Sequence, residues 1–289
     1  MKFRFIEKHR EVHSVAKMAR MLGVTRGGYY AWRSRAPSKR SRQEERIVEE
    51  IKAIQAEVKD RYGSPRVHRE LRCRGIRAGH NRVARLMRLK GLGAKRRKRY
   101  RSTTDSGHSL PVAENLLNRG FEVPAANQVW VSDLTYIPTA EGWLYLCTIL
   151  DLHSRRVVGW SMSSRMTTQL VVQALLMAVL LRRPPKGLIF HSDRGSQYCS
   201  HVFRRWAGHY GIRQSMSRKG DCWDNAPAES FFKTLKAELY GHRAFRSRQE
   251  ARTAIFEYIE VFYNRVRLHS SLGYRSPAEY ERQGALDAA

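Results

Sequence analysis

Residues 129–137 read VWVSDLTYI, an apolar, aromatic and β-branched run in which Asp133 closes the first half. Side chains of this kind favour strands, so the run predicts a strand. A second apolar run, LIFHSD at 188–193, ends in Asp193. Glu229 opens the segment AESFFKTLK at 228–236, whose spacing predicts an amphipathic helix. Carboxylates at strand ends and on a facing helix can converge on divalent metal, so these three are the candidate site.

The three carboxylates predict phosphoryl-transfer chemistry. Residues 194–228, 35 in all, separate Asp193 from Glu229. Two metal ions roughly 3.5–4 Å apart can stabilise both the attacking and the leaving oxygen of such a reaction. Taken alone, Glu229 and Lys233 fit an ordinary exposed ion pair of about 0.2–0.5 kcal/mol better than a catalytic role. It is the convergence with Asp133 and Asp193 that favours a catalytic interpretation.

Neighbouring polar residues are expected to support this site. His191, two residues before Asp193, is expected to touch the site and support the metal ligands without binding metal itself. Asn225 is expected to cap the Glu229 helix and to support the ligands in the same way. The other nearby acidic residues are expected to order turns and loops, with the last two as alternatives to Glu229: Asp151, Asp221 and Asp224.

The charge distribution points to a polyanionic partner. The chain has 289 residues and a formal net charge of +28. Residues 1–110 hold 31 Lys and Arg against ten Asp and Glu, whereas the rest holds 23 against 16. Nucleic acid is the usual partner of so large an excess. The basic half therefore predicts DNA binding, and the other half predicts the chemistry.

The composition also limits cofactors and compartment. None of the four cysteines forms a C-x-x-C pair, so no structural zinc site is expected. No glycine-rich loop ends in Gly-Lys-Ser/Thr, so no nucleotide cofactor is expected. Mg²⁺ suits carboxylate, water and phosphate oxygens, with Mn²⁺ as a substitute. The start lacks an apolar signal region, no apolar stretch is long enough to span a bilayer, and scattered cysteines fit a cytoplasmic protein.

Two helical units are expected in the basic half. In residues 1–36, Gly23 stops one helix and Thr25 caps the next, as in a helix-turn-helix, with an ordinary helical hairpin as the alternative. Residues 43–100 predict a second helix-turn-helix-like domain, and 101–120 a basic and polar linker. The residues of this half that are expected to contact DNA are Arg26, Arg82, Arg85, Arg88, Lys95, Arg96, Arg97, Lys98 and Arg99.

The pattern changes to strands in residues 121–289. The expected strands are 130–137, 143–151, 156–162, 187–191 and 213–217, and the expected helices are 168–181, 201–210, the Glu229 helix and 248–263. This order predicts an α/β, RNase H-like core, a mixed five-stranded sheet with flanking helices. Its first and fourth strands are neighbours, so Asp133 and Asp193 should lie side by side. Lys233 and Lys236 share a helix face with Glu229 and predict a lysine stripe along a phosphate backbone.

Several spaced motifs resemble a known family. WVSDLTYI at 130–137, HSDRGSQY at 191–198 and DNAPAESFFK at 224–233 resemble the integrase-core motifs of bacterial insertion-sequence transposases. The resemblance is closest to the second-reading-frame (OrfB) product of the IS-three family. YNRVRLHSSLGY at 263–274 resembles its C-terminal signature, and ARMLGVTR at 19–26 its N-terminal part.

The resemblance implies roles for individual residues. The family's D,D(35)E triad falls on Asp133, Asp193 and Glu229, and its basic residue seven positions later falls on Lys236, which would hold terminal DNA. Members commonly act as a fusion with an upstream OrfA product that carries a helix-turn-helix and a leucine zipper. No sustained heptad occurs here, so OrfA, or an OrfA–OrfB fusion, is an expected partner, together with other copies of the chain on DNA.

These observations predict a DNA transposase subunit that nicks and joins the ends of an insertion sequence in the bacterial cytoplasm, near the nucleoid. One alternative is a nuclease of the same fold that cuts without joining. Another is a non-catalytic DNA-binding repressor of the element. A metal-dependent strand-transfer assay distinguishes the three.

Overall fold

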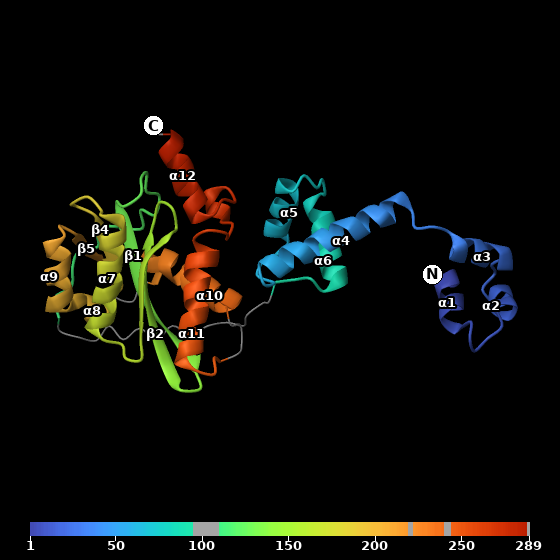
Figure 1. Ribbon diagram of the computed structural model, residues 1–289, viewed down its shortest axis with the longest axis horizontal. Helices are drawn as coiled ribbons and strands as arrows, with labels where there is room; N and C mark the ends of the chain where they lie inside the picture. The colour runs from blue at the N-terminus through green and yellow to red at the C-terminus, as the bar shows by residue number, and fades with distance from the viewer. Residues whose placement is uncertain (95–109, 219–221, 240–243, 288–289) are drawn as a thin grey trace.

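The computed structural model describes residues 1–94, 110–218, 222–239 and 244–287. Figure 1 shows three parts along the chain: a small helical body at the N-terminus, a second helical body, and a sheet with flanking helices. None of the described helices combines the length and the apolar character needed to cross a bilayer.

The N-terminal body has its own small core. It consists of α1 (Lys2–His9), α2 (Val15–Met21) and α3 (Arg26–Ser34), which pack around the buried ring of Tyr29. Gly23 has a φ of 62°, and Thr25 Oγ1 accepts a hydrogen bond from the Gly28 amide at 3.0 Å. The expected turn and helix cap are therefore confirmed.

The second helical body contains three helices. They are α4 (Lys39–Glu57), α5 (Ser64–Cys73) and α6 (His80–Lys90). α4 begins before residue 43, where the helix-turn-helix-like domain was expected to start, because Ser38 caps it, accepting a hydrogen bond from the Ser41 amide at 3.1 Å. α6 ends at Gly91, which has a φ of 67°.

The sheet is mixed and five-stranded, as expected. Its strands are β1 (Val129–Thr139), β2 (Gly142–Asp151), β3 (Val157–Ser163), β4 (Ile189–Ser192) and β5 (Arg213–Met216). Their order is β3-β2-β1-β4-β5, with antiparallel pairs β3–β2 and β2–β1 and parallel pairs β1–β4 and β4–β5. This is the RNase H-like arrangement, and it makes β1 and β4 neighbours.

Two helical layers cover the sheet. One core unites it with α7 (Thr168–Arg182), α8 (Ser196–Cys199) and α9 (His201–His209). The other unites it with α10 (Ala226–Leu239) and α11 (Arg248–Phe256). Figure 1 shows α7–α9 and α10–α11 on opposite sides of the strands. Gly159 on β3 permits close packing of α7, because a Cβ there would lie 2.4 Å from the Ala174 carbonyl oxygen.

The last long helix departs from its expected form. Instead of one α-helix to residue 263, the chain changes at Glu257 to a π-helix, η2 (Glu257–Tyr263). The wider turn allows Tyr258, Ile259, Phe262 and Tyr263 all to be buried. Two short 3₁₀ segments, η1 (Cys222–Asn225) and η3 (Ser270–Leu272), and a further helix, α12 (Pro277–Asp287), complete the described elements.

The second helical body is attached to the part that contains the sheet. Tyr62 Oη donates to the Val266 carbonyl at 3.1 Å and accepts from the Leu268 amide at 3.0 Å. Arg66 Nε donates to the Leu268 carbonyl at 2.8 Å. Arg61 lies over the Phe262 ring at 4.4 Å, and one hydrophobic core spans both parts. These contacts hold α5 at a defined place beside residues 262–274, here called the C-terminal segment.

Residues 110–120, expected to belong to a linker, pack along the edge of the sheet. The amides of Leu116 and Leu117 donate to Ser215 Oγ at 2.9 and 3.2 Å, and the Met216 amide donates to the Glu114 carbonyl at 3.3 Å. The polar composition of the segment does not reveal this long-range pairing. The domain limits at 1–36, 43–100 and 121–289 stay predictions.

Candidate active site

Asp133 on β1 and Asp193, directly after β4, lie at corresponding positions of neighbouring parallel segments. The ladder between β1 and β4 ends two residues before each carboxylate, and both residues are half-buried. Asp133 Oδ1 accepts a hydrogen bond from the Leu134 amide at 2.7 Å, and Asp193 Oδ1 accepts one from the Gly195 amide at 3.0 Å. The expected juxtaposition follows directly from the strand order.

The surroundings of Asp133 disfavour its ionised form. Burial and the negative charge of Asp193 raise the pKa of Asp133 well above its usual value, and Glu229 adds to this effect. Lys236 acts in the opposite direction. Carboxylates held together in this way are stabilised by a cation between them.

Glu229 approaches from the helix that faces the strands. It lies in the first turn of α10 and is exposed, whereas Ala228 and Phe231 of the same turn are buried in the core. Partial burial raises the pKa of the Glu229 carboxyl, and Lys233 lowers it. Helix α10 therefore places a third carboxylate within electrostatic reach of Asp133.

Asn225 connects the start of α10 with β1. Its Nδ2 donates to the carbonyl of Ser132, the residue before Asp133, at 3.1 Å, and its side chain is 4% exposed. Asn225 was expected to cap α10, but its side-chain amide instead donates a hydrogen bond to β1. It fixes the distance between the element that carries Glu229 and the element that carries Asp133.

Lys236, expected to share a lysine stripe with Lys233 along a phosphate backbone, is buried beside β1. Lys236 is 4% exposed, and its Nζ lies 5.4 Å from the centre of the Tyr136 ring on β1. Its charge lowers the pKa of Asp133. Lys233 is exposed one turn after Glu229. The two lysines differ because β1 packs against the part of α10 that carries Lys236.

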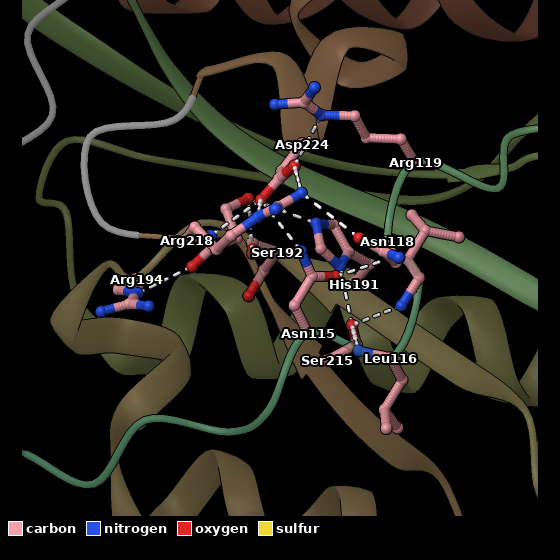
Figure 2. Close-up of polar contacts among 12 residues, drawn as sticks. Asn115, Leu116, Asn118, Arg119, His191, Ser192, Arg194, Ser215, Arg218 and Asp224 are labelled. Atoms are coloured by element: carbon pink, nitrogen blue, oxygen red, sulfur yellow. Dashed lines mark hydrogen bonds and ion pairs between the residues drawn. The ribbon is translucent and has the colours of Figure 1, made fainter.

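Asp224, before α10, is the buried centre of a polar cluster (Figure 2). Its side chain is fully buried and accepts hydrogen bonds from Arg218, Arg119 and Asn115 at 2.9–3.1 Å. The hydrogen bonds from the Arg218 side chain, with a smaller contribution from Arg119, hold the pKa of Asp224 far below its usual range. We call Asn115, Arg119, Arg218 and Asp224 the Asp224 cluster. It confirms the loop-ordering role expected for Asp224, whereas Asp221 lies outside the described residues.

His191 faces β5 instead of the carboxylates. Its Nδ1 lies 2.8 Å from Ser215 Oγ, its Nε2 lies 3.2 Å from Ser217 Oγ, and its side chain is fully buried. Burial lowers the pKa of His191 to about 4, so the ring is neutral at physiological pH. Figure 2 shows His191 between Ser215 and the Asp224 cluster. Its contacts support the loop before α10.

Only some of the basic residues that were expected to contact DNA are exposed on the surface. Arg82 and Arg85 lie 3.6 and 2.6 Å from Glu44 of α4, and Arg82 also donates to Gln43. They therefore hold α6 against α4 instead of forming an open basic face with Arg88. Arg88 and Arg26 are exposed. The expected cationic run Lys95, Arg96, Arg97, Lys98 and Arg99 lies outside the described residues.

The donors at the site suit a divalent cation by their chemistry. Asp133, Asp193 and Glu229 offer oxygen ligands, and repulsion between the first two favours a bound positive charge. Among the described residues, no group of three or more His, Cys, Asp and Glu side chains is arranged to hold a metal ion. Asp151, the acid that could be mistaken for a ligand, instead accepts hydrogen bonds from the amides of Asn127, His153 and Ser154, which confirms its structural role.

Two sets of contacts were not found from the sequence: the hydrogen-bond partners of Asp224, and the contact between Ser132 on β1 and Tyr198. Arg119 and Asn115 precede Asp224 by more than 100 residues, so no local pattern links them. Ser132 Oγ lies 2.8 Å from Tyr198 Oη beneath the site, another long-range contact. The presence of Tyr198 in the HSDRGSQY motif was the one available signal.

Family models match both parts of the chain. A model described as an integrase core domain matches residues 123–222, and a second model with this description matches residues 210–277. A model described as an HTH-like domain matches residues 42–100. The first two matches contain all three candidate carboxylates.

Full-length relatives agree with these matches. The "Insertion element IS600 uncharacterized 31 kDa protein" of Shigella sonnei is 49% identical over 266 residues, which cover 92% of this chain and 98% of that protein. "Transposase InsF for insertion sequence IS3A" of Escherichia coli (strain K12) is 44% identical over 285 residues, which cover 98% of this chain and 99% of that protein. A chain of the simian T-cell lymphotropic virus intasome aligns with 80% of this chain and 74% of its own length, at 14% identity and a TM-score of 0.47. By its HTH-like domain, its integrase core and its identity to these relatives over nearly its whole length, the chain belongs to the IS-three (IS3) family of insertion-sequence transposases.

Proposed function

We propose that this chain nicks DNA at the 3′ ends of its insertion sequence and joins the freed 3′-hydroxyls to another phosphodiester, with Asp133, Asp193 and Glu229 as the catalytic and metal-binding residues. One observation carries the proposal. Two half-buried carboxylates, one on β1 and one directly after the neighbouring parallel strand β4, lie close enough for the charge of Asp193 to raise the pKa of Asp133, and the facing helix bears a third carboxylate.

The proposed cofactor is Mg²⁺, with Mn²⁺ as a substitute and without a nucleotide. When bound, such ions stabilise the attacking and leaving oxygens of a phosphoryl transfer. Asp133 and Asp193 would hold metal from the sheet, and Glu229 would do so from α10. The positive charge of Lys236 favours the ionised form of Asp133, which metal binding requires.

The proposed DNA contacts extend from this site. Lys233 is exposed one turn after Glu229, where a phosphate contact would fix the register of the scissile strand without reading its sequence. Arg26 and Arg88 offer further exposed charges. Lys236, by contrast, is proposed to act on DNA only through the site, because it is buried.

Two kinds of protein partner are proposed: further copies of this chain and the OrfA product. Several copies are proposed to assemble on the two element ends, because each end needs a catalytic site. The product of an upstream OrfA frame, separate or fused, is proposed to supply recognition of the terminal repeats. The proposed location is the bacterial cytoplasm, where the nucleoid offers both substrate and target.

A strand-transfer assay tests this function. The full chain, with and without OrfA, is mixed with duplexes carrying the element ends and a supercoiled target, in Mg²⁺, in Mn²⁺ or in chelator. We expect 3′ nicks and joined products in either metal and neither in chelator. Nicks without joined products would favour the nuclease, and DNA binding without either product would favour the repressor.

A further inference from the structure

A basic pocket lies where the second helical body meets the C-terminal segment. Its volume is about 380 Å³. The residues that line it, here called the α5 pocket, are Pro65, His68, Arg69, Arg72, His80 and Tyr274. The first four recur at intervals of three and four residues, so they share one face of α5. His80 is the first residue of α6, and Tyr274 follows η3.

The arginines of α5 fall into two groups. Arg66 donates to the Leu268 carbonyl at 2.8 Å, and Arg74 lies within 4 Å of three glutamates. Arg69 and Arg72, which line the pocket, have no ion-pair partner among the described residues, and Arg69 Nε is buried without a hydrogen-bond acceptor there. Buried charged donors are normally satisfied, so Arg69 Nε calls for an acceptor from outside the chain. Arg72 is exposed at the same pocket and can donate to that acceptor.

The remaining walls of the pocket are held in place. The rings of His68 and His80 meet nearly at right angles, with centroids 5.7 Å apart. Tyr274 has a φ of 59°, a left-handed conformation that a non-glycine residue keeps only when its surroundings impose it. Its amide donates to the His269 carbonyl at 2.8 Å, which fixes this turn. Strained backbone of this kind is concentrated at ligand sites.

We propose that the α5 pocket binds one backbone phosphate of duplex DNA, held between the HTH-like domain and the C-terminal segment. Arginine matches the geometry of a phosphate with two parallel donors, and the pocket combines two arginines with the positive end of α6. The inference rests on the proposed function, because DNA is the phosphate-bearing substrate of that function.

A phosphate in this pocket would be fixed relative to the catalytic site. Tyr62 and Arg66, on either side of Pro65 in the chain, bind the backbone at Val266 and Leu268. Tyr274 belongs to the same C-terminal segment. The pocket would therefore set the position of the DNA on the core without reading its sequence.

Equilibrium binding without divalent metal tests the pocket independently of catalysis. The full-length double variant Arg69→Gln, Arg72→Gln is compared with wild type on an element-end duplex and on a random duplex, over a series of salt concentrations. We expect binding about tenfold weaker on both duplexes, because a charge-assisted contact is lost. The slope of log affinity against log salt should fall by about 0.9, the value for one phosphate. Arg77→Gln, an exposed arginine outside the pocket, should change the slope by much less.

Protection of wild-type arginines keeps the test valid if the double variant fails to fold. DNA should protect Arg69 and Arg72, but not Arg77, from phenylglyoxal, as read by mass spectrometry. Unchanged affinity and slope in a folded double variant, or equal losses in Arg77→Gln, would overturn the proposal. Protection by inorganic phosphate but not by DNA would overturn the assignment to DNA. If wild type bound no duplex at all, the proposed function would fail first.

Discussion

Asp224→Asn tests whether the Asp224 cluster positions α10. The substitution keeps the size of the side chain but removes the charge that Arg119 and Arg218 contact at 3.1 Å. Asp224 is fully buried, whereas both arginine side chains are about half exposed and can return to water. Hydrogen bonds to a charged group contribute about 1.5–3 kcal/mol, and the solvation of the arginines favours the lower part of this range. We expect a loss of about 2 kcal/mol, or roughly 4–8 °C in Tm for a domain of this size.

The pH dependence of this loss identifies its cause. The folded-state pKa of Asp224 is lowered, so its contribution is complete above the ordinary pKa of about 3.9 and shrinks as pH falls below it. The Tm difference between wild type and Asp224→Asn should therefore be constant near neutral pH and diminish in acid. The element-end cleavage rate should fall while DNA affinity is kept, because Glu229 lies in the first turn of the helix that the cluster positions.

Scanning calorimetry, chemical denaturation and single-turnover cleavage provide the measurements. Asp287→Asn, the same change at an exposed aspartate of α12, is the matched control and should have little effect. An Asp224→Asn protein with the stability and cleavage rate of this control would refute the positioning role. A Tm loss that persisted unchanged to the lowest accessible pH would refute its electrostatic origin.

Three further predictions concern the charge beside Asp133, the attachment of α5, and the burial of Asp133 itself. Lys236→Met should shift the acidic limb of the pH–rate profile for end cleavage to higher pH, because Lys236 lowers the pKa of Asp133; an unmoved limb would show that its charge does not act on the site. Tyr62→Phe should lower the unfolding free energy in urea by about 1–2 kcal/mol, because Val266 and Leu268 lose a partner, and an unchanged midpoint would contradict the attachment of α5. Without metal, Asp133→Asn should raise Tm at neutral pH, since the raised pKa means that the ionised carboxyl disfavours the folded state. This gain should disappear below the ordinary pKa of about 3.9, and a Tm loss at neutral pH would contradict the burial argument.

The parts of the fold that depend on local patterns were predictable. The apolar runs that contain Asp133 and Asp193 became neighbouring strands, and the order of strands and helices sufficed to place them together. Thr25 and Gly23 marked a helix start and a helix end for steric and hydrogen-bonding reasons that act within a few residues.

The parts that depend on distant partners were not predictable. Lys236 has the spacing of an exposed helix residue, yet the Tyr136 ring on β1 covers it. The spacing of Arg82 and Arg85 predicted a DNA-binding face. Their partner Glu44 lies about 40 positions earlier, so no local pattern reveals the ion pairs. His191 was placed correctly on its strand, but the pairing of β4 with β5 turns its ring toward Ser215. In each case tertiary packing decides what a charged side chain contacts.

The central claim is that Asp133, Asp193 and Glu229 act together on metal and DNA. The most direct measurement is single-turnover nicking and joining of element-end duplexes in Mg²⁺ by Asp133→Asn, Asp193→Asn and Glu229→Gln, each at a concentration shown to saturate the DNA. We expect all three variants to bind the duplex about as well as wild type and to form no nicked or joined product. Product formed at the wild-type rate by any one of them would remove that residue from the site.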